Sequence, residues 1–118
     1  MTSKKKNIRR ISSSITALSK RVVSYYKPEK VILFGSHVWG KPTMESDVDV
    51  LIIKRTLKSK IERQRELRAR LYPMSMPVDF IVYTPSELKK KVRNDCNLFI
   101  KDVLKNGIVL YEKNKIRR

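Results

Sequence analysis

The sequence predicts a two-layer α+β domain in which helices cover mainly one face of a mixed β-sheet. Runs rich in β-branched and aromatic residues at Val31–Phe34, Val48–Ile53 and Val78–Tyr83 are typical of core strands. Segments with the apolar periodicity of helices precede and separate these runs. The length of 118 residues suits a single domain with a modest core, so any large acceptor molecule is expected to come from outside.

The composition describes a small folded protein with a heavily charged surface. Apolar residues make up 41% of the chain and charged residues 33%. The formal net charge of +17 favours an anionic partner, such as a nucleoside triphosphate, RNA or an acidic protein, without choosing among them. Much of this charge falls in three clusters whose simplest interpretation is solvated faces and tails: Lys4–Arg10, Lys54–Arg70 and Lys113–Arg118.

The cysteine count and the hydropathy of the chain indicate the cellular compartment in which the protein is expected. Cys96 is the only cysteine, which excludes an intrachain disulfide and a cysteine-rich zinc site. No apolar run approaches the roughly 18 residues of a membrane span, and no signal-type apolar segment follows the basic N-terminus. We therefore expect a cytoplasmic protein without a membrane partner. Its domain is predicted over residues 7–112, between a disordered basic tail at 1–6 and a basic tail at 113–118.

Two helices are predicted in the first two thirds of the chain. The first runs from Asn7, a candidate N-cap, to Tyr26, and Pro28 prevents its continuation. Its apolar stripe has steps of three and four: Ile8, Ile11, Ile15, Leu18, Val22 and Tyr25. A thinner stripe among many charges predicts a surface helix over Thr56–Leu71, with apolar residues at Leu57, Ile61, Leu67 and Leu71.

The remaining elements follow from turn and cap signals. Thr84, Pro85 and Glu87 form a helix-start signature directly after the third strand. A last helix is expected to open at Asn94 or Asp95. Asn106-Gly107 is predicted to end that helix with a left-handed cap, before a short final strand over Ile108–Tyr111.

Three acids fall at or near predicted strand starts. Asp47 and Asp49 lie two residues apart where the second strand begins, so their side chains project from the same face. Asp79 occupies a similar position near the start of the third strand. Clustered carboxylates repel one another unless a cation lies between them, and magnesium prefers such hard oxygen ligands. We therefore predict a magnesium site at Asp47, Asp49 and Asp79.

The polar loop between the first two strands is a candidate phosphate-binding loop. Gly35 and Gly40 let the backbone turn tightly and approach a ligand, and Ser36 adds a hydroxyl beside backbone N–H groups. Ser46 is expected to orient the loop or Asp47 rather than to act as a nucleophile.

Loop and acids together indicate nucleotidyl transfer. The loop would hold a triphosphate while Asp47 and Asp49 hold metal on it. Asp79 would either ligate a second metal or deprotonate the acceptor hydroxyl. The lone histidine, His37, is left out of catalysis, because an exposed loop histidine most often has no such role.

The order Gly35-Ser36, Gly40, Ser46-Asp47-x-Asp49, then Asp79 resembles the pattern of the minimal nucleotidyltransferases of the DNA polymerase β-like superfamily. The similarity covers most of the chain, including the segments VDFIVYTPSEL and IKDVLKNGIVLYE. It implies the nucleotidyltransferase fold, with two Mg²⁺ ions and ATP as substrate. It also implies catalytic and metal-binding roles for the three acids, and nucleotide contacts from the glycines and serines of the pattern.

Small members of this family are best known as antitoxins paired with a HEPN-domain ribonuclease toxin. The resemblance therefore implies a hetero-complex in which AMP passes from ATP to a tyrosine of that toxin and silences it. One segment departs from the family. Its loops often read Gly-Ser-x-Ala-Arg-Gly, whereas this chain has His37-Val38-Trp39 before Gly40, so that Trp39 stands in place of the arginine.

Two other interpretations remain open. The chain could modify small molecules as the aminoglycoside-modifying relatives do, working as a homodimer whose neighbour completes the acceptor pocket. It could instead be a non-catalytic module that neutralises a partner by contact or binds RNA weakly through its basic surface. The net charge of +17 favours the second interpretation, and the intact acids argue against it.

Overall fold

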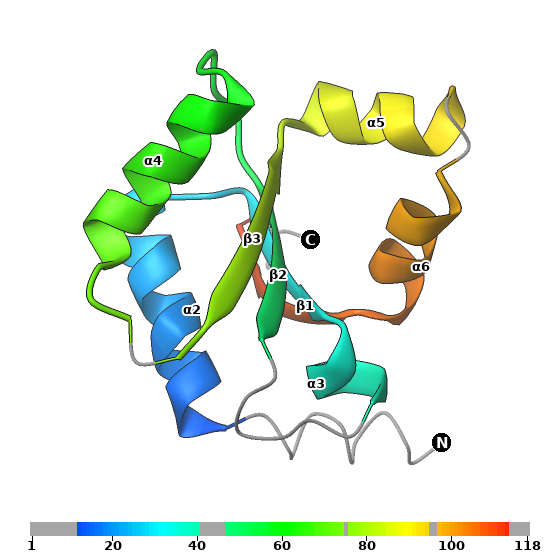
Figure 1. The fold of residues 1–118 in the computed structure, drawn as a ribbon. Helices are drawn as coiled ribbons and strands as arrows, with labels where there is room; N and C mark the ends of the chain where they lie inside the picture. Colours follow the sequence, from blue (N-terminus) through cyan, green and yellow to red (C-terminus); the bar gives the residue numbers. More distant parts are fainter. Residues whose placement is uncertain (1–11, 41–46, 75, 95–96, 114–118) are drawn as a thin grey trace.

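The computed structural model describes residues 12–40, 47–74, 76–94 and 97–113. In chain order its elements are α2 (Ser13–Tyr26), β1 (Lys30–Phe34), α3 (Ser36–Trp39), β2 (Val48–Ile53), α4 (Lys60–Leu71), β3 (Val78–Tyr83), α5 (Pro85–Arg93), α6 (Leu98–Asn106) and β4 (Ile108–Glu112) (Figure 1). None of the helices within these ranges is long and apolar enough to cross a membrane. Apart from Lys113, the predicted tails lie outside the described residues, so the domain boundaries stay a prediction.

Within the described part of the chain, the strands form one mixed sheet in the order β3-β2-β1-β4. Strand β1 pairs antiparallel with β2 and β4, whereas β2 and β3 run parallel. Strands β2 and β3 have the predicted bounds, and β1 begins one residue earlier than predicted, at Lys30. The final strand extends one residue beyond the predicted Tyr111, to Glu112. Because β1 runs against β2 and β3, its C-terminal end meets their N-terminal ends at one end of the sheet.

Helices α2 and α4 pack on one face of the sheet, while α5 and α6 lie on the other (Figure 1). The larger core lies on the α2/α4 face, which confirms the predicted α+β fold and its main helical layer. A smaller cluster forms on the α6 face around Ile32, Phe34, Leu51 and Val103. Burial of each such side chain contributes about 1.5–3 kcal/mol. The largest fully buried side chains in the described part of the chain are Val22, Val31, Ile32, Leu33, Val48, Val50, Leu51, Ile52, Leu67, Leu71, Ile100 and Val103.

Helix α2 starts later than its apolar periodicity predicts. Ser12 is extended, with φ −71° and ψ 159°, and its hydroxyl accepts a hydrogen bond from the Ile15 N–H at 3.1 Å. The preference of serine for the N-cap position therefore outweighs the apolar repeat, and the prediction of one helix running through Ser12 is wrong. Asn7, Ile8 and Ile11 lie outside the described residues.

Helix α4 also begins later than predicted, at Lys60 rather than Thr56. A capping box fixes this start, because the Ser59 hydroxyl accepts from the Glu62 N–H and the Glu62 carboxylate accepts from the Ser59 N–H. Leu57 consequently lies before the helix and is fully exposed, and Ile61 is 66% exposed. The predicted stripe is therefore buried only at its other two leucines, Leu67 and Leu71.

Helix α6 is capped by Asn97, whose side chain accepts a hydrogen bond from the Ile100 N–H at 3.0 Å. The prediction of a start at Asn94 is wrong, because Asn94 is the C-cap of α5, and Asp95 lies outside the described residues. The two asparagines lie three residues apart and both have a side chain suited to an N-cap, so residue type alone does not choose between them.

The predicted left-handed cap at Gly107 is also wrong, because this residue is extended, with φ −69° and ψ 166°. Glycine is required here because a side chain would not fit, and not because of the backbone conformation. A Cβ at Gly107 would lie 2.6 Å from the Ile32 Cγ2 and from the Val103 carbonyl oxygen. The glycine lets the turn between α6 and β4 pass close to β1.

Side chains of α4 close the outer edge of β3. Gln64 donates to the Phe80 carbonyl at 2.7 Å, and Arg68 donates to the Val78 carbonyl at 3.2 Å. Arg63 donates to a third carbonyl of the same strand at 3.2 Å. An open strand edge is a template for pairing with another chain, so these contacts protect the sheet from edge-to-edge association.

The predicted start of α5 is confirmed by a capping box between Thr84 and Glu87, with Pro85 in the first turn. The Glu87 carboxylate also accepts hydrogen bonds of 2.8 and 3.0 Å from the guanidinium of Arg63 on α4. The Arg63 side chain is only 5% exposed. This arginine is the main reason why the pKa of Glu87 falls to about 2. The pair joins helices that pack on opposite faces of the sheet.

Replacing Glu87 by glutamine should reduce the acid sensitivity of the fold. Because its pKa falls from 4.5 to about 2 on folding, the stabilisation from Glu87 is complete above pH 4.5 and is lost as the pH falls toward 2. Glu87→Gln should lower the free energy of unfolding by about 1–2 kcal/mol at pH 7, a value reduced for the partial exposure of this carboxylate. Urea denaturation at a series of pH values measures the difference. Glu112→Gln, at an exposed ion pair of 3.6 Å, is the matched control. An equal loss near pH 7 and near pH 2 would contradict the assignment.

Candidate active site

Three carboxylates gather at the end of the sheet where β2 and β3 begin. Asp49 pairs in register with Asp79 on the parallel strand β3, and Asp47 directly precedes β2. Val48 and Val78 point into the α2/α4 core, so the alternation of strand side chains places all three acids on the opposite face. The acids therefore share one face and one end of the sheet.

The carboxylates of Asp47 and Asp79 lie close enough to Asp49 to change its pKa. Asp49 is partly buried, whereas Asp47 and Asp79 are exposed. Burial raises the pKa of Asp49, and repulsion by the Asp79 and Asp47 carboxylates raises that pKa further. The nearby imidazole of His37 acts in the opposite direction and lowers it. A cation brought to this end of the sheet would relieve the repulsion.

Gly35 lies against the carboxylate of Asp49 at the end of β1. Its φ of 83° belongs to the region that L side chains rarely adopt. A Cβ at this position would also overlap the Asp49 Oδ2. The approach follows from the register of the sheet, in which Phe34 pairs with Asp49. Glycine is therefore needed here for its backbone conformation and for the space it leaves.

The candidate phosphate loop begins with the single helical turn α3. The Val38 N–H donates to the Gly35 carbonyl at 2.9 Å, and the Gly40 N–H donates to the Ser36 carbonyl at 3.1 Å. Val38 is buried and anchors this turn to the core. A Cβ at Gly40 would lie only 3.0 Å from the Ser36 Cα, so the turn closes tightly. Phosphate binding by this turn stays a prediction, and Ser46 lies outside the described residues.

His37 is the residue that sequence reasoning set aside. It stands directly after the Gly-Ser step in α3, close enough to Asp49 to lower the pKa of that carboxyl. Its position in the turn that follows β1 was the signal available in the sequence. The departure at His37-Val38-Trp39 therefore brings a titratable group beside the carboxylates, while the side chain of Trp39 is not described.

Metal binding depends on the arrangement of possible ligands among the described side chains. Among them, no group of three His, Cys, Asp or Glu residues is arranged so that it could hold a metal ion. Magnesium commonly needs less from the protein, since one or two carboxylates suffice when substrate phosphates and water complete its shell. The paired strands supply such carboxylates at Asp49 and Asp79, and the repulsion at Asp49 fits a cation. The three-carboxylate metal site stays a prediction.

Comparisons with known proteins show which family and fold this chain resembles. The family described as "Polymerase beta, Nucleotidyltransferase" matches residues 17–116. A protein of Methanocaldococcus jannaschii named "Putative protein adenylyltransferase" is 35% identical over 83 residues, which are 70% of this chain and 78% of that protein. The crystal structure of a "putative nucleotidyltransferase" from Sulfolobus solfataricus superimposes with a TM-score of 0.59 at 21% identity, covering 98% of this chain and 91% of the other. At 21% identity, the similarity to the Sulfolobus solfataricus structure shows a shared fold only.

Proposed function

Because this chain belongs to the polymerase β nucleotidyltransferase family, we propose that it transfers AMP from ATP to a hydroxyl group of a protein. The observation that carries the proposal is the in-register pair of Asp49 and Asp79, with Asp47 on the same face and Gly35 against the Asp49 carboxylate. The name of the Methanocaldococcus jannaschii relative supports a protein as the acceptor and AMP as the transferred group.

The proposed reaction forms one bond and breaks one. The oxygen of the acceptor hydroxyl attacks the α-phosphorus of ATP, and the bond from that phosphorus to the bridging oxygen breaks, so that pyrophosphate leaves. The carboxylate of Asp79 is exposed and would either accept the proton of the hydroxyl or serve as a further metal ligand. Gly35 leaves room for the Asp49 carboxylate at the end of the sheet, because a Cβ at this position would overlap its Oδ2.

The carboxylates of Asp47 and Asp49, with Asp79 as a further ligand, would hold magnesium, which when bound neutralises charge on the triphosphate. The burial of Asp49 and its repulsion by its two neighbours support this donor set. The turn over Ser36 and Gly40 would contact the phosphates through backbone N–H groups.

The acceptor that we propose is a tyrosine of a HEPN-type ribonuclease toxin, so that the chain acts as the antitoxin of a cytoplasmic pair. The support is the pattern that this chain shares with small family members, from Gly35-Ser36 to Asp79. The strongly positive surface, with a net charge of +17, suits a complex with an acidic partner.

The test combines the chain with the HEPN-domain protein encoded beside it, magnesium and ATP labelled at the α-phosphate. Label should appear on the HEPN protein, and its ribonuclease activity should fall in proportion. The double substitution Asp47→Ala/Asp49→Ala should abolish both effects. The matched control is Asp102→Ala/Glu112→Ala, which removes the same charge from exposed positions on α6 and β4 and should behave like the unmodified chain. Full inhibition of the ribonuclease by the Asp47→Ala/Asp49→Ala chain would refute adenylylation and indicate neutralisation by contact.

A further inference from the structure

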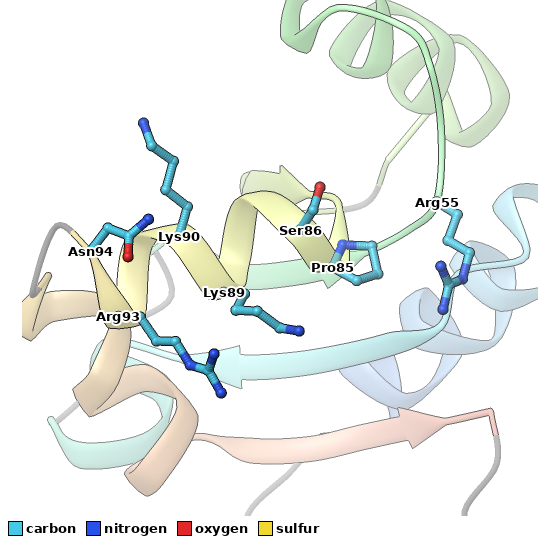
Figure 2. Close-up of a pocket in the computed structure, with 7 residues that line it drawn as sticks. All are labelled: Arg55, Pro85, Ser86, Lys89, Lys90, Arg93 and Asn94. Atoms are coloured by element: carbon cyan, nitrogen blue, oxygen red, sulfur yellow. The ribbon is translucent and has the colours of Figure 1, made fainter.

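The strongest feature outside the carboxylate site is a basic groove beneath α5, lined by Arg55, Ser86, Lys89, Lys90 and Arg93. Figure 2 shows the side chains of Lys89 and Arg93 extending from α5 toward the sheet, with Arg55 at the opposite end of the groove. Its volume is about 460 Å³, and among the described residues no acidic side chain lines it. We call this feature the α5 groove.

Three of the four cations that line the α5 groove lack carboxylate partners within the described part of the chain. Lys89, Lys90 and Arg93 take part in none of the ion pairs there, and Arg55 has only a 3.9 Å contact with Glu29. No residue of α5 is buried, so the helix rests on the sheet without a packed apolar face of its own. Unpaired charges held together on a helix that packs loosely point to an anionic ligand.

A second hollow continues the α5 groove past the start of α5. It has a volume of about 620 Å³ and shares Arg55 and Ser86 with the first. Leu57 lines it and is fully exposed. The acid of this hollow, Glu87, is already bound to Arg63, so it does not cancel the neighbouring positive charge. The combined surface therefore offers cations at one end and an aliphatic contact at the other.

We propose that the α5 groove and the hollow beside Leu57 bind an acidic polypeptide segment that carries an aliphatic anchor. Carboxylates of the segment would pair with Lys89, Arg93 and Arg55, while an apolar side chain covers Leu57. A single-stranded nucleic acid fits less well, because its bases normally stack on aromatic side chains and none of the described ones lines either hollow. Ser86 adds a hydroxyl that can bond to a peptide backbone.

The groove is separate from the carboxylate site. Strand β2 leads from Asp49 toward Arg55, a path of roughly 20 Å at about 3.3 Å per residue. Both sites lie on the α5/α6 side of the sheet. An acceptor protein could thus be held in the groove while another of its segments reaches the acids. This inference rests on the proposed function for the identity of the acceptor as a protein, and binding without ATP tests the groove separately.

The test measures binding of a short fluorescent peptide of Asp, Glu and Leu by anisotropy in the absence of ATP. Lys89→Glu/Arg93→Glu should weaken binding by about 10-fold or more, and Lys89→Gln/Arg93→Gln should weaken it by a smaller factor. Lys20→Glu/Lys105→Glu makes the same change in net charge at exposed positions on α2 and α6, and should weaken binding by less than about 3-fold. Equal losses in the two charge-reversed chains would overturn the groove as a site.

Two further measurements test whether the ligand is a peptide or a nucleic acid. Leu57→Ser should weaken peptide binding by roughly 3-fold or more while leaving its salt dependence unchanged, because it removes an apolar contact only. An oligouridylate of matching length should bind more weakly than the peptide and should be insensitive to Lys89→Gln/Arg93→Gln. Tighter binding of the oligouridylate, lost in that variant, would overturn the peptide assignment in favour of a nucleic acid.

Discussion

Replacing Asp49 by asparagine should lower the rate of AMP transfer by roughly 10³-fold or more, as expected for loss of a charged group at the reacting phosphates. Asp49 is the most buried of the three acids, and the carboxylates of Asp79 and Asp47 both raise its pKa. Asparagine keeps its size but removes the charge that would hold a cation. The fold should be retained, because the substitution also removes repulsion from Asp79 and Asp47. Release of pyrophosphate from ATP in the presence of the acceptor measures the rate.

The control for this substitution is Asp102→Asn. Asp102 is exposed on α6 and accepts a hydrogen bond from Asn106 at 2.6 Å. Its replacement should leave the transfer rate within about 2-fold and the free energy of unfolding within about 0.5 kcal/mol. A comparable loss of rate in both variants would show that net charge, rather than the position of Asp49, matters.

Gly35→Ala should disable the site through the backbone. The residue has φ 83°, and an added Cβ would overlap the Asp49 Oδ2, so either β1 or the Asp49 carboxylate must move. We expect a loss of about 1–3 kcal/mol in the free energy of unfolding and a fall of roughly 10²-fold in transfer rate. Thermal unfolding and pyrophosphate release measure the two effects.

Gly40→Ala is the matched substitution in the same loop. Gly40 has an extended backbone with φ −118°, and a Cβ there would lie 3.0 Å from the Ser36 Cα. The neighbouring turn must shift by only a few tenths of an ångström. Its effect on stability and rate should therefore be smaller than that of Gly35→Ala. The reverse order would contradict the role assigned to the contact between Gly35 and Asp49.

Local patterns were sufficient for the strands and insufficient for the helix starts. The apolar run Val48–Ile53 has the predicted bounds because burial on both faces leaves few other arrangements for such a sequence. Helix starts depend on side-chain caps that compete with periodicity. Ser12 and Ser59 cap their helices through their hydroxyls, which moves Leu57 out of its predicted helix and leaves it exposed.

In the candidate site, too, local sequence patterns predict some features, whereas the register of the sheet determines the others. The spacing of Asp47 and Asp49 predicts their common face, because alternation along one strand is a local property. Their alignment with Asp79 depends on the parallel register of β2 and β3, and the contact of Gly35 with Asp49 depends on the register of β1. Register links residues far apart in the sequence, so a single sequence does not determine it.

The most direct test of the account compares ATP labelled at the α-phosphate with ATP labelled at the γ-phosphate, using the same chain, acceptor protein and magnesium. Attack at the α-phosphorus predicts that the α-label becomes covalently attached to the acceptor and that the γ-label leaves in pyrophosphate. Asp49→Asn should abolish both signals. Attachment of the γ-label to the acceptor would identify phosphoryl transfer and contradict the proposal that Asp47, Asp49 and Asp79 form a nucleotidyl-transfer site.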